Sequence, residues 1–192
     1  MRVALYGGSF NPPHVCHVMT VAYVLSTQPV DAVWVMPVGR HAFAKGRHLA
    51  DYAHRHRMCE LAMEPFGARV LVCDVEHRLP GTSRTIDTVD HLRAEHPAIA
   101  FSLVVGTDLL AERHQWKDFD RLERTVPLVV IGRAGAPTPD GYVASPPLPD
   151  VSSRDIRRRL SAGQRADGLV PRGVWAYVIE NGLYQGPVGA GA

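Results

Sequence analysis

The feature that most constrains the fold is a set of short apolar runs that recur along the chain. Five of these runs are continuous and rich in β-branched residues: "VALY" at 3–6, "AVWVMPV" at 32–38, "RVLVCDV" at 69–75, "AFSLVVG" at 100–106 and "VPLVVIG" at 126–132. Continuous apolar runs, unlike alternating ones, are typical of strands that are buried on both faces. They therefore predict five parallel strands.

Segments with helical spacing lie between and after these runs. They cover residues 17–26, 51–63, 85–96, 118–124, 152–160 and 172–181. Strand and helix in alternation predict βαβ crossovers and an open, doubly wound α/β sheet, with a C-terminal helical part from about residue 151. Ligands of such sheets bind beyond the carboxyl ends of the strands, so the residues that follow each strand are the place to look for a site.

Length and composition limit the class of protein. A chain of 192 residues suits one domain with a substantial core, and 46% hydrophobic with 21% charged residues is ordinary for a globular protein. The net charge of +2 does not indicate a partner such as a nucleic acid polymer, which would need lysines and arginines concentrated on one face. Because no stretch approaches about 20 apolar residues, no membrane span is expected.

Cysteine usage and two segments add further expectations. Cys16, Cys59 and Cys73 are an odd number without paired spacing, which favours reduced thiols and a cytoplasmic protein. Residues 134–150 contain five prolines and are expected to form an exposed loop that connects its neighbours. Residues 186–192 are expected to be a disordered tail.

The first candidate site follows the first strand, at "GGSFNPPHVCH", residues 7–17. Gly7 and Gly8 are expected to let the backbone turn tightly and approach a ligand. His14 and His17 fall at the start of the next helix, where three-residue spacing puts both rings on one face. Backbone N–H groups and the helix dipole favour an anion there, so the segment predicts a phosphate site.

Two other interpretations of these histidines stay open. One is structural: His17 packs within the helix and His14 caps it. The other is a zinc site, which is weaker because no third ligand stands at a recognisable spacing. Four further histidines keep it as an alternative: His41, His48, His54 and His56.

A second candidate segment is "VSSRDIRRRL" at residues 151–160. Ser152, followed three residues later by Asp155, is a start signal resembling a capping box. The same helix N-terminus carries hydroxyl, backbone N–H and guanidinium groups, which suit phosphate oxygens. The residues that supply them are Ser153, Arg154 and Arg157.

Together these two segments resemble the nucleotidyltransferases of the HxGH superfamily, most closely the bacterial nicotinate-nucleotide adenylyltransferases. Four more stretches are similar to that family: "HAFAKGRHLADYAHRHRM", "SRTIDT" at 83–88, "GTDLL" at 106–110 and the closing "LVPRGVWAYVIENGLY". The resemblance covers almost the whole chain in order. It implies a Rossmann-like fold of the nucleotidyltransferase type, in a single domain over residues 1–192.

The resemblance also implies a reaction. AMP passes from ATP to nicotinate mononucleotide, a pyridine mononucleotide, giving deamido-NAD and pyrophosphate in NAD biosynthesis. The phosphate oxygen of the mononucleotide attacks the α-phosphorus in line, so the protein mainly positions two polyanions and stabilises developing charge. Mg²⁺ is the implied cofactor and is expected to be held largely by phosphates, with no metal ligands from the protein.

Site residues are carried over from the matching motifs. The implied catalytic residues are His14, His17 and Arg157. The implied ATP-binding residues are Gly7, Gly8, Ser9, Phe10, His14, His17, Lys45, Gly106, Asp108, Ser152, Ser153, Arg154 and Arg157. The implied mononucleotide-binding residues are Ser9, Phe10, Lys45, Thr85, Asp108 and Trp116. Among these, Thr85 would meet the pyridine carboxylate, Asp108 the ribose hydroxyls and Trp116 the pyridine ring.

Two positions depart from the family pattern. Cys16 stands where the HxGH motif has glycine, and Arg154 stands where the second motif has threonine. In the family that the chain resembles, this glycine lets the nucleotide lie close to the helix, so Cys16 either narrows the nucleotide pocket or is accommodated by a shift of the helix. We hypothesise that Cys16 weakens ATP binding. The alternatives are an adenylyltransferase that prefers nicotinamide mononucleotide or another phosphorylated acceptor such as phosphopantetheine, and a weakly active nucleotide-binding module. A homo-oligomer is left open.

Overall fold

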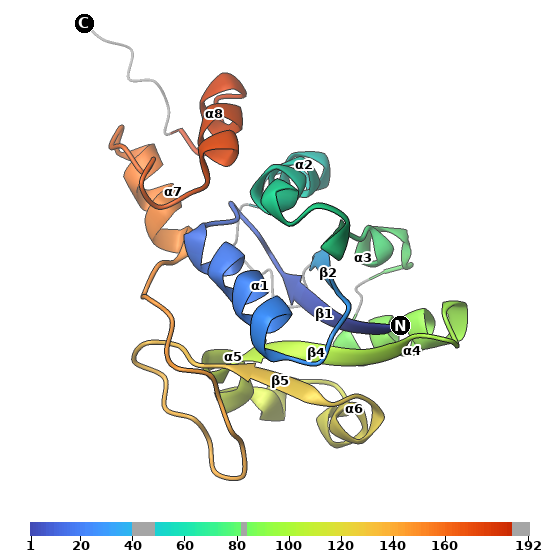
Figure 1. Cartoon of the computed structure of the whole chain (residues 1–192). Coiled ribbons are helices and arrows are strands. Elements are labelled where there is room, and N and C mark those ends of the chain that lie inside the picture. Colours follow the sequence, from blue (N-terminus) through green and yellow to red (C-terminus); the bar gives the residue numbers. More distant parts are fainter. Residues whose placement is uncertain (40–48, 82–83, 186–192) are drawn as a thin grey trace, which may run out of the picture.

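The five predicted strands form one parallel sheet in the computed structural model, which describes residues 1–39, 49–81 and 84–185. They are β1 (Arg2–Gly8), β2 (Ala32–Pro37), β3 (Val70–Val72), β4 (Ala100–Gly106) and β5 (Leu128–Ile131). Their order across the sheet is β3-β2-β1-β4-β5, with helices on both faces (Figure 1). The Rossmann-like α/β prediction is confirmed. The predicted tail, 186–192, lies outside the described residues.

Eight α-helices are present in the described part of the chain. They are α1 (Val15–Thr27), α2 (Tyr52–Met63), α3 (Val75–Arg78), α4 (Thr85–Glu95), α5 (Thr107–Ala111), α6 (Phe119–Thr125), α7 (Ser153–Ser161) and α8 (Arg172–Glu180). The six predicted helices are all found. Helices α3 and α5 were not predicted, because four or five residues are too few to show a helical period.

Each face of the sheet carries its own apolar cluster. Ala4 and Tyr6 of β1 belong to the cluster that α1, α2, α7 and α8 cover. Val3 and Leu5, between them in sequence, belong to the cluster that α3, α4 and α6 cover. Successive side chains of a strand point to opposite faces, so burial of both faces requires apolar residues at every position. This explains the continuous runs.

The order of the strands fixes where a ligand can bind. From β1 the chain adds β2 and β3 on one side and then returns to place β4 and β5 on the other. The direction therefore switches between β1 and β4, and a crevice forms beyond the carboxyl ends of these two strands. Those ends are Gly8 and Gly106.

Part of the proline-rich segment is not the exposed loop that was predicted. The backbone N–H of Ser145 donates to Val130 O, and that of Leu148 donates to Gly132 O, both at 3.0 Å. Ser145 is buried, and its Oγ accepts from Gly132 N at 2.9 Å. Because β5 is an edge strand, its backbone groups need partners, and this segment supplies them. Most of the segment, including Ala134, Asp140 and Val143, is exposed as expected.

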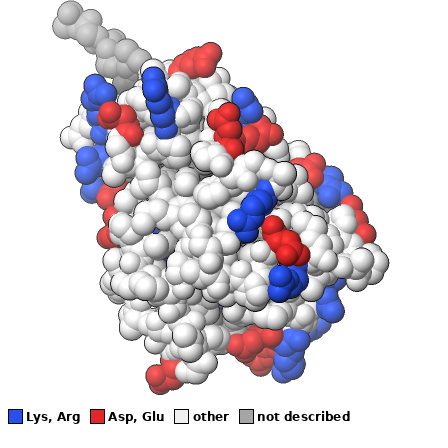
Figure 2. Space-filling model, viewed as in Figure 1, with Lys and Arg blue, Asp and Glu red and all other residues white. Residues whose placement is uncertain are grey.

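The surface shows no strongly basic face in the view of Figure 2. Lysine and arginine side chains there lie next to aspartate and glutamate around the rim of the molecule. Within the described residues, no helix is long and apolar enough to cross a membrane.

Replacement of Gly132 tests the close packing of this segment on β5. A Cβ at position 132 would lie 2.5 Å from Ser145 O and 3.0 Å from the Cα of Pro147, both backbone atoms that cannot rotate away. We expect Gly132→Ala to lower the free energy of unfolding by about 1–3 kcal/mol in urea titrations. Gly168→Ala is the control, since no atom lies within 4 Å of its Cβ. Equal stabilities of the two variants would contradict this packing.

Candidate active site

The turn after β1 lies later than the sequence analysis placed it. Gly7 and Gly8 belong to β1 and pair with Met36 and Pro37 of β2, so they do not form the turn. The turn covers residues 9–12 and contains Phe10, whose φ of +44° is left-handed. Gly8 is needed for a different reason: a Cβ there would lie 3.1 Å from the buried ring of Phe10.

His14 and His17 lie together at the start of α1. His14 is the N-cap, both side chains are buried, and their rings stack with centroids 3.7 Å apart. The ring of His17 also contacts that of Phe10, at 4.9 Å. The backbone N–H of His14 donates to Nδ1 of His17 at 3.0 Å, so the proton of neutral His17 is on Nε2. The two rings therefore share one face, and both also pack as the structural interpretation expects.

Burial keeps both imidazoles uncharged. It lowers the pKa of His14 to about 3 and holds the pKa of His17 well below its ordinary value. The nearby guanidinium of Arg133 lowers both pKa values further. A neutral imidazole still donates one N–H, but it brings no positive charge. The positive charge for binding a polyanion must therefore come from arginine or lysine side chains.

Arg133 is a candidate site residue that the sequence analysis missed. It follows β5, and its Nε lies 4.0 Å from Oδ1 of Asp108, an exposed residue in the first turn of α5. Gly106, at the end of β4, gives room to this pair, because a Cβ there would clash with Asp108 Oδ1 and lie 3.4 Å from Arg133 Nε. The position of Arg133 directly after a predicted strand was the signal that could have found it.

The two motifs that the sequence analysis paired meet in the structure. Oγ of Ser153 donates to Pro12 O at 2.8 Å, and Nη1 of Arg157 donates to Asn11 O at 2.7 Å. Both donors are on α7, more than 140 residues along the chain from the carbonyls that accept. The N-terminal part of α7 is thereby fixed against the 9–12 turn, beside α1 (Figure 1).

The start of α7 has the predicted cap. Ser152 is the N-cap, and its Oγ accepts from the backbone N–H of Asp155 at 3.1 Å. Arg154 is exposed in the first turn of the helix, whereas Arg157 is half-buried against the 9–12 turn. The second motif therefore presents one guanidinium to solvent and holds the other in the site.

A buried arginine on α2 was also missed. Arg55 is 2% exposed, and its Nη1 donates to Ser9 O at 3.1 Å while its Nε donates to Ala50 O at 2.9 Å. No acidic side chain of the described residues forms an ion pair with it. Its positively charged guanidinium therefore contacts the 9–12 turn directly. Nothing in the local pattern of α2 distinguished it from the neighbouring Arg57.

The residues expected to bind the mononucleotide come from three places: Ser9 and Phe10 lie in the 9–12 turn, Thr85 starts α4, and Asp108 and Trp116 follow β4. Thr85 is the first residue of α4, so the helix begins inside the predicted motif. Trp116 is half-buried and packs on Phe119 with ring centroids 5.9 Å apart, so it has both a core contact and an exposed part. Lys45 lies outside the described residues, and so does Ser83 of the "SRTIDT" motif.

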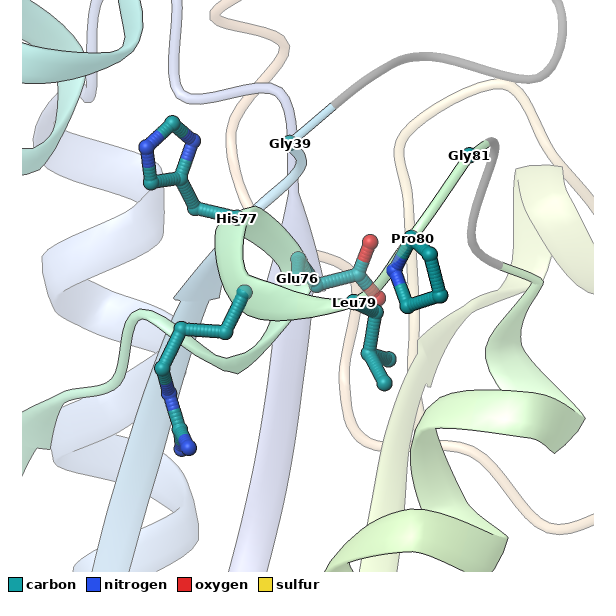
Figure 3. A pocket seen from close by; sticks show the side chains of 7 residues that line it. Gly39, Glu76, His77, Leu79, Pro80 and Gly81 are labelled. Carbon is teal, nitrogen blue, oxygen red and sulfur yellow. The ribbon is translucent and has the colours of Figure 1, made fainter.

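A cavity of about 340 Å³ lies beside α3. It lies between Gly39, just after β2, and residues 76–81, which include most of α3 (Figure 3). Oε1 of Glu76, which lines it, accepts from Oγ1 of Thr88 on α4 at 2.9 Å. One residue that lines the cavity is therefore hydrogen-bonded to α4, the helix that begins at Thr85.

The histidines of the zinc alternative have other partners where they can be described. His54 Nδ1 lies 3.0 Å from the hydroxyl of Tyr177, and His56 lies 3.6 Å from a carboxylate oxygen of Glu60. His41 and His48 fall outside the described residues. Across 1–39, 49–81 and 84–185, no group of three or more histidine, cysteine, aspartate or glutamate residues is arranged to hold a metal ion.

Cys16, the departure from the HxGH pattern, is fully buried in α1. Its Sγ donates to Pro149 O at 3.2 Å, just before α7. Burial raises the pKa of the thiol, which disfavours the thiolate that a nucleophile would need. The side chain thus fills the space between α1 and the segment that leads into the second motif.

The hypothesis about Cys16 gives a kinetic prediction. Removing the side chain frees space beside α1, so we expect Cys16→Gly to lower the KM for ATP severalfold. Cys59→Ala is the control, because Cys59 is a buried thiol on α2 and should leave that KM unchanged. Steady-state kinetics at saturating acceptor measure it. Equal ATP KM values for wild type and Cys16→Gly would refute the hypothesis.

The lowered histidine pKa values predict how stability depends on pH. The pKa of His14 is 6.5 in the unfolded chain and about 3 in the folded one. Between these two pH values, the unfolded chain binds a proton that the folded chain does not. Stability is therefore lost as pH falls through this range. We expect the Tm of a His14→Gln, His17→Gln double variant to fall less between pH 7.5 and pH 5 than that of wild type. Parallel Tm curves would show that the buried imidazoles are not the cause.

Comparison with known proteins gives the family. A family model described as cytidylyltransferase-like matches residues 5–159. A relative from Anaeromyxobacter dehalogenans, named a probable nicotinate-nucleotide adenylyltransferase, is 44% identical and aligns over 96% of this chain and 97% of its own. A relative of the same name from Myxococcus xanthus is 43% identical over 96% and 95% of the two chains.

Solved structures show the same fold. The nicotinic acid mononucleotide adenylyltransferase of Plasmodium falciparum, complexed with NaAD, superposes with a TM-score of 0.83 at 20% identity, covering 95% of this chain and 97% of that one. Its complex with APC gives a TM-score of 0.81. With the relatives above, the chain belongs to the nicotinate-nucleotide adenylyltransferases, within the cytidylyltransferase-like family.

Proposed function

We propose that this protein transfers AMP from ATP to nicotinate mononucleotide, forming deamido-NAD and pyrophosphate. The observation that carries the proposal is the junction of the two motifs. Hydrogen bonds from Ser153 and Arg157 hold α7 against the 9–12 turn, at the carboxyl edge of β1. Two helix N-termini, those of α1 and α7, thus lie at the switch point of the sheet, where a polyanion is favoured.

The reaction needs positioning more than covalent chemistry. An anionic phosphate oxygen of the mononucleotide attacks the α-phosphorus of ATP, a new P–O bond forms, and the bond to the β-phosphate bridging oxygen breaks. Pyrophosphate leaves with the electron pair, so the protein need not remove a proton from the nucleophile. The protein holds the two phosphates in line and stabilises the charge that develops.

The geometry suggests how the first motif and Arg157 share the ATP phosphates. His14 and His17 donate hydrogen bonds as neutral imidazoles, and Arg157 supplies charge. The one hydroxyl proton of Ser153 is already donated to Pro12 O, so any contact of Ser153 with phosphate uses its backbone N–H. Ser152 accepts at Oγ from Asp155, which leaves its O–H as a donor. Lys45 is proposed as a further point charge.

The preference for nicotinate over nicotinamide mononucleotide has an electrostatic basis in this proposal. Thr85 starts α4, and the partial positive charge of a helix N-terminus favours a carboxylate over a neutral amide. In the same proposal, the exposed part of Trp116 stacks on the pyridine ring and Asp108 binds ribose hydroxyls.

Mg²⁺ is proposed to enter with ATP. Phosphate oxygens of ATP can hold the ion, so the proposal needs no cage of metal ligands from the protein. When bound, Mg²⁺ neutralises part of the triphosphate charge.

An assay of product formation tests the proposed function. Mixing the protein with ATP, Mg²⁺ and nicotinate mononucleotide should release pyrophosphate in step with deamido-NAD. Nicotinamide mononucleotide and phosphopantetheine, tested as acceptors under the same conditions, should give a lower kcat/KM. A stable complex with ATP and no turnover would favour the binding-module alternative.

Replacement of Arg157 tests its assigned role. Loss of one preorganised charged donor costs roughly 3 kcal/mol of activation free energy, so Arg157→Ala should lower kcat about a hundredfold. Arg158→Ala is the matched control, since Arg158 is exposed on the same helix and pairs with Asp155 at 2.6 Å. Equal kcat values for the two variants would remove Arg157 from the catalytic residues.

A further inference from the structure

The 9–12 turn needs support from outside itself. Phe10 has a φ of +44°, in a left-handed region that residues with a Cβ rarely adopt. Such a conformation persists when surrounding contacts fix it. In the proposed reaction the backbone of this turn faces two sets of phosphates, so whatever holds the turn also positions the reacting groups.

Donors from three distant parts of the chain hold the turn. Arg55 of α2 donates to Ser9 O, and the two α7 donors described above hold the carbonyls of residues 11 and 12. The third part is Tyr184, beyond the end of α8, whose hydroxyl donates to Oδ1 of Asn11 at 2.8 Å. Tyr184 and Asn11 are 173 residues apart in sequence.

Asn11 is the point through which Tyr184 reaches the turn. Its side chain is 1% exposed, and its Oδ1 accepts from two donors, Tyr184 Oη and the backbone N–H of Ala50 at 3.0 Å. Because the site is buried, water cannot easily replace a lost donor. Removal of the Tyr184 hydroxyl therefore leaves Asn11 with a weaker anchor.

The structure holds Tyr184 as a donor at this position. Its φ of +63° is left-handed, like that of Gly182 just after α8. Burial raises the pKa of its hydroxyl, against the opposing effect of the charges on Arg157 and Arg55, so the hydroxyl keeps its proton at neutral pH.

We propose that Tyr184 is a positioning residue for the adenylyl transfer proposed above. Its hydroxyl, acting through Asn11 Oδ1, fixes the 9–12 turn and with it the N-terminus of α1 where His14 and His17 lie. Tyr184 contacts no substrate in this proposal. Small displacements of a positioned group lower the rate of the chemical step more than they lower binding.

Two matched tyrosine variants test the proposal. Tyr184→Phe keeps the ring and removes one hydroxyl, and Tyr177→Phe does the same within α8, at the contact with His54. Loss of one buried hydrogen bond predicts that Tyr184→Phe lowers kcat about fivefold to tenfold. The KM values for both substrates should stay within about twofold. Tyr177→Phe should leave kcat within about twofold of the wild-type value, and its Tm should be similar to that of Tyr184→Phe.

A double-mutant cycle separates positioning from general stability. If Tyr184 acts through Asn11, then Tyr184→Phe should change kcat less than about twofold in an Asn11→Ala background. An equal fall in both backgrounds, or a kcat of Tyr184→Phe equal to that of Tyr177→Phe, would overturn the proposal.

Amide hydrogen exchange gives a readout that does not depend on activity. Tyr184→Phe should speed exchange at the amides of Ser9, Phe10 and Asn11, and Tyr177→Phe should not. Unchanged exchange in Tyr184→Phe would overturn the positioning role. A wild-type protein that releases no pyrophosphate would instead refute the proposed function, so the two failures are distinguishable.

Discussion

The arrangement depends on the hydrogen bonding of one short turn. The backbone carbonyls of residues 9, 11 and 12 accept from Arg55, Arg157 and Ser153, which lie on two helices far away in sequence. Because the turn contains a left-handed Phe10, these bonds determine its shape as well as its place. They also join the sheet, α2 and α7 at the switch point, so the candidate site is complete only when both helices pack against the turn.

The candidate site combines neutral hydrogen-bond donors with positively charged side chains. His14 and His17 are neutral because they are buried and lie near Arg133, and they offer N–H groups at fixed positions. Arg55, Arg133 and Arg157 carry the positive charge around them. A polyanion entering such a site meets donors already oriented and cations partly desolvated, which strengthens each interaction relative to water.

Sequence alone determined the layers of this protein and the approximate position of its candidate site. Apolar residues at every position of the strand segments could only suit a sheet covered on both faces, as Val3 to Tyr6 show. The start of α7 was readable at Ser152, because a cap is a local interaction. His14 was a candidate site residue because it comes after the first strand and ligands bind beyond strand ends.

Tertiary structure decided which distant residues meet. Nothing in local periodicity links Tyr184 to Asn11, or the proline-rich segment to β5, since these contacts depend on how whole elements pack. Likewise, Gly7 and Gly8 read as a turn in sequence, but pairing with β2 draws them into the strand. Patterns along a chain reflect local geometry and burial. The hydrogen bonds that hold this site join segments far apart in sequence, so they form only when the whole fold brings those segments together.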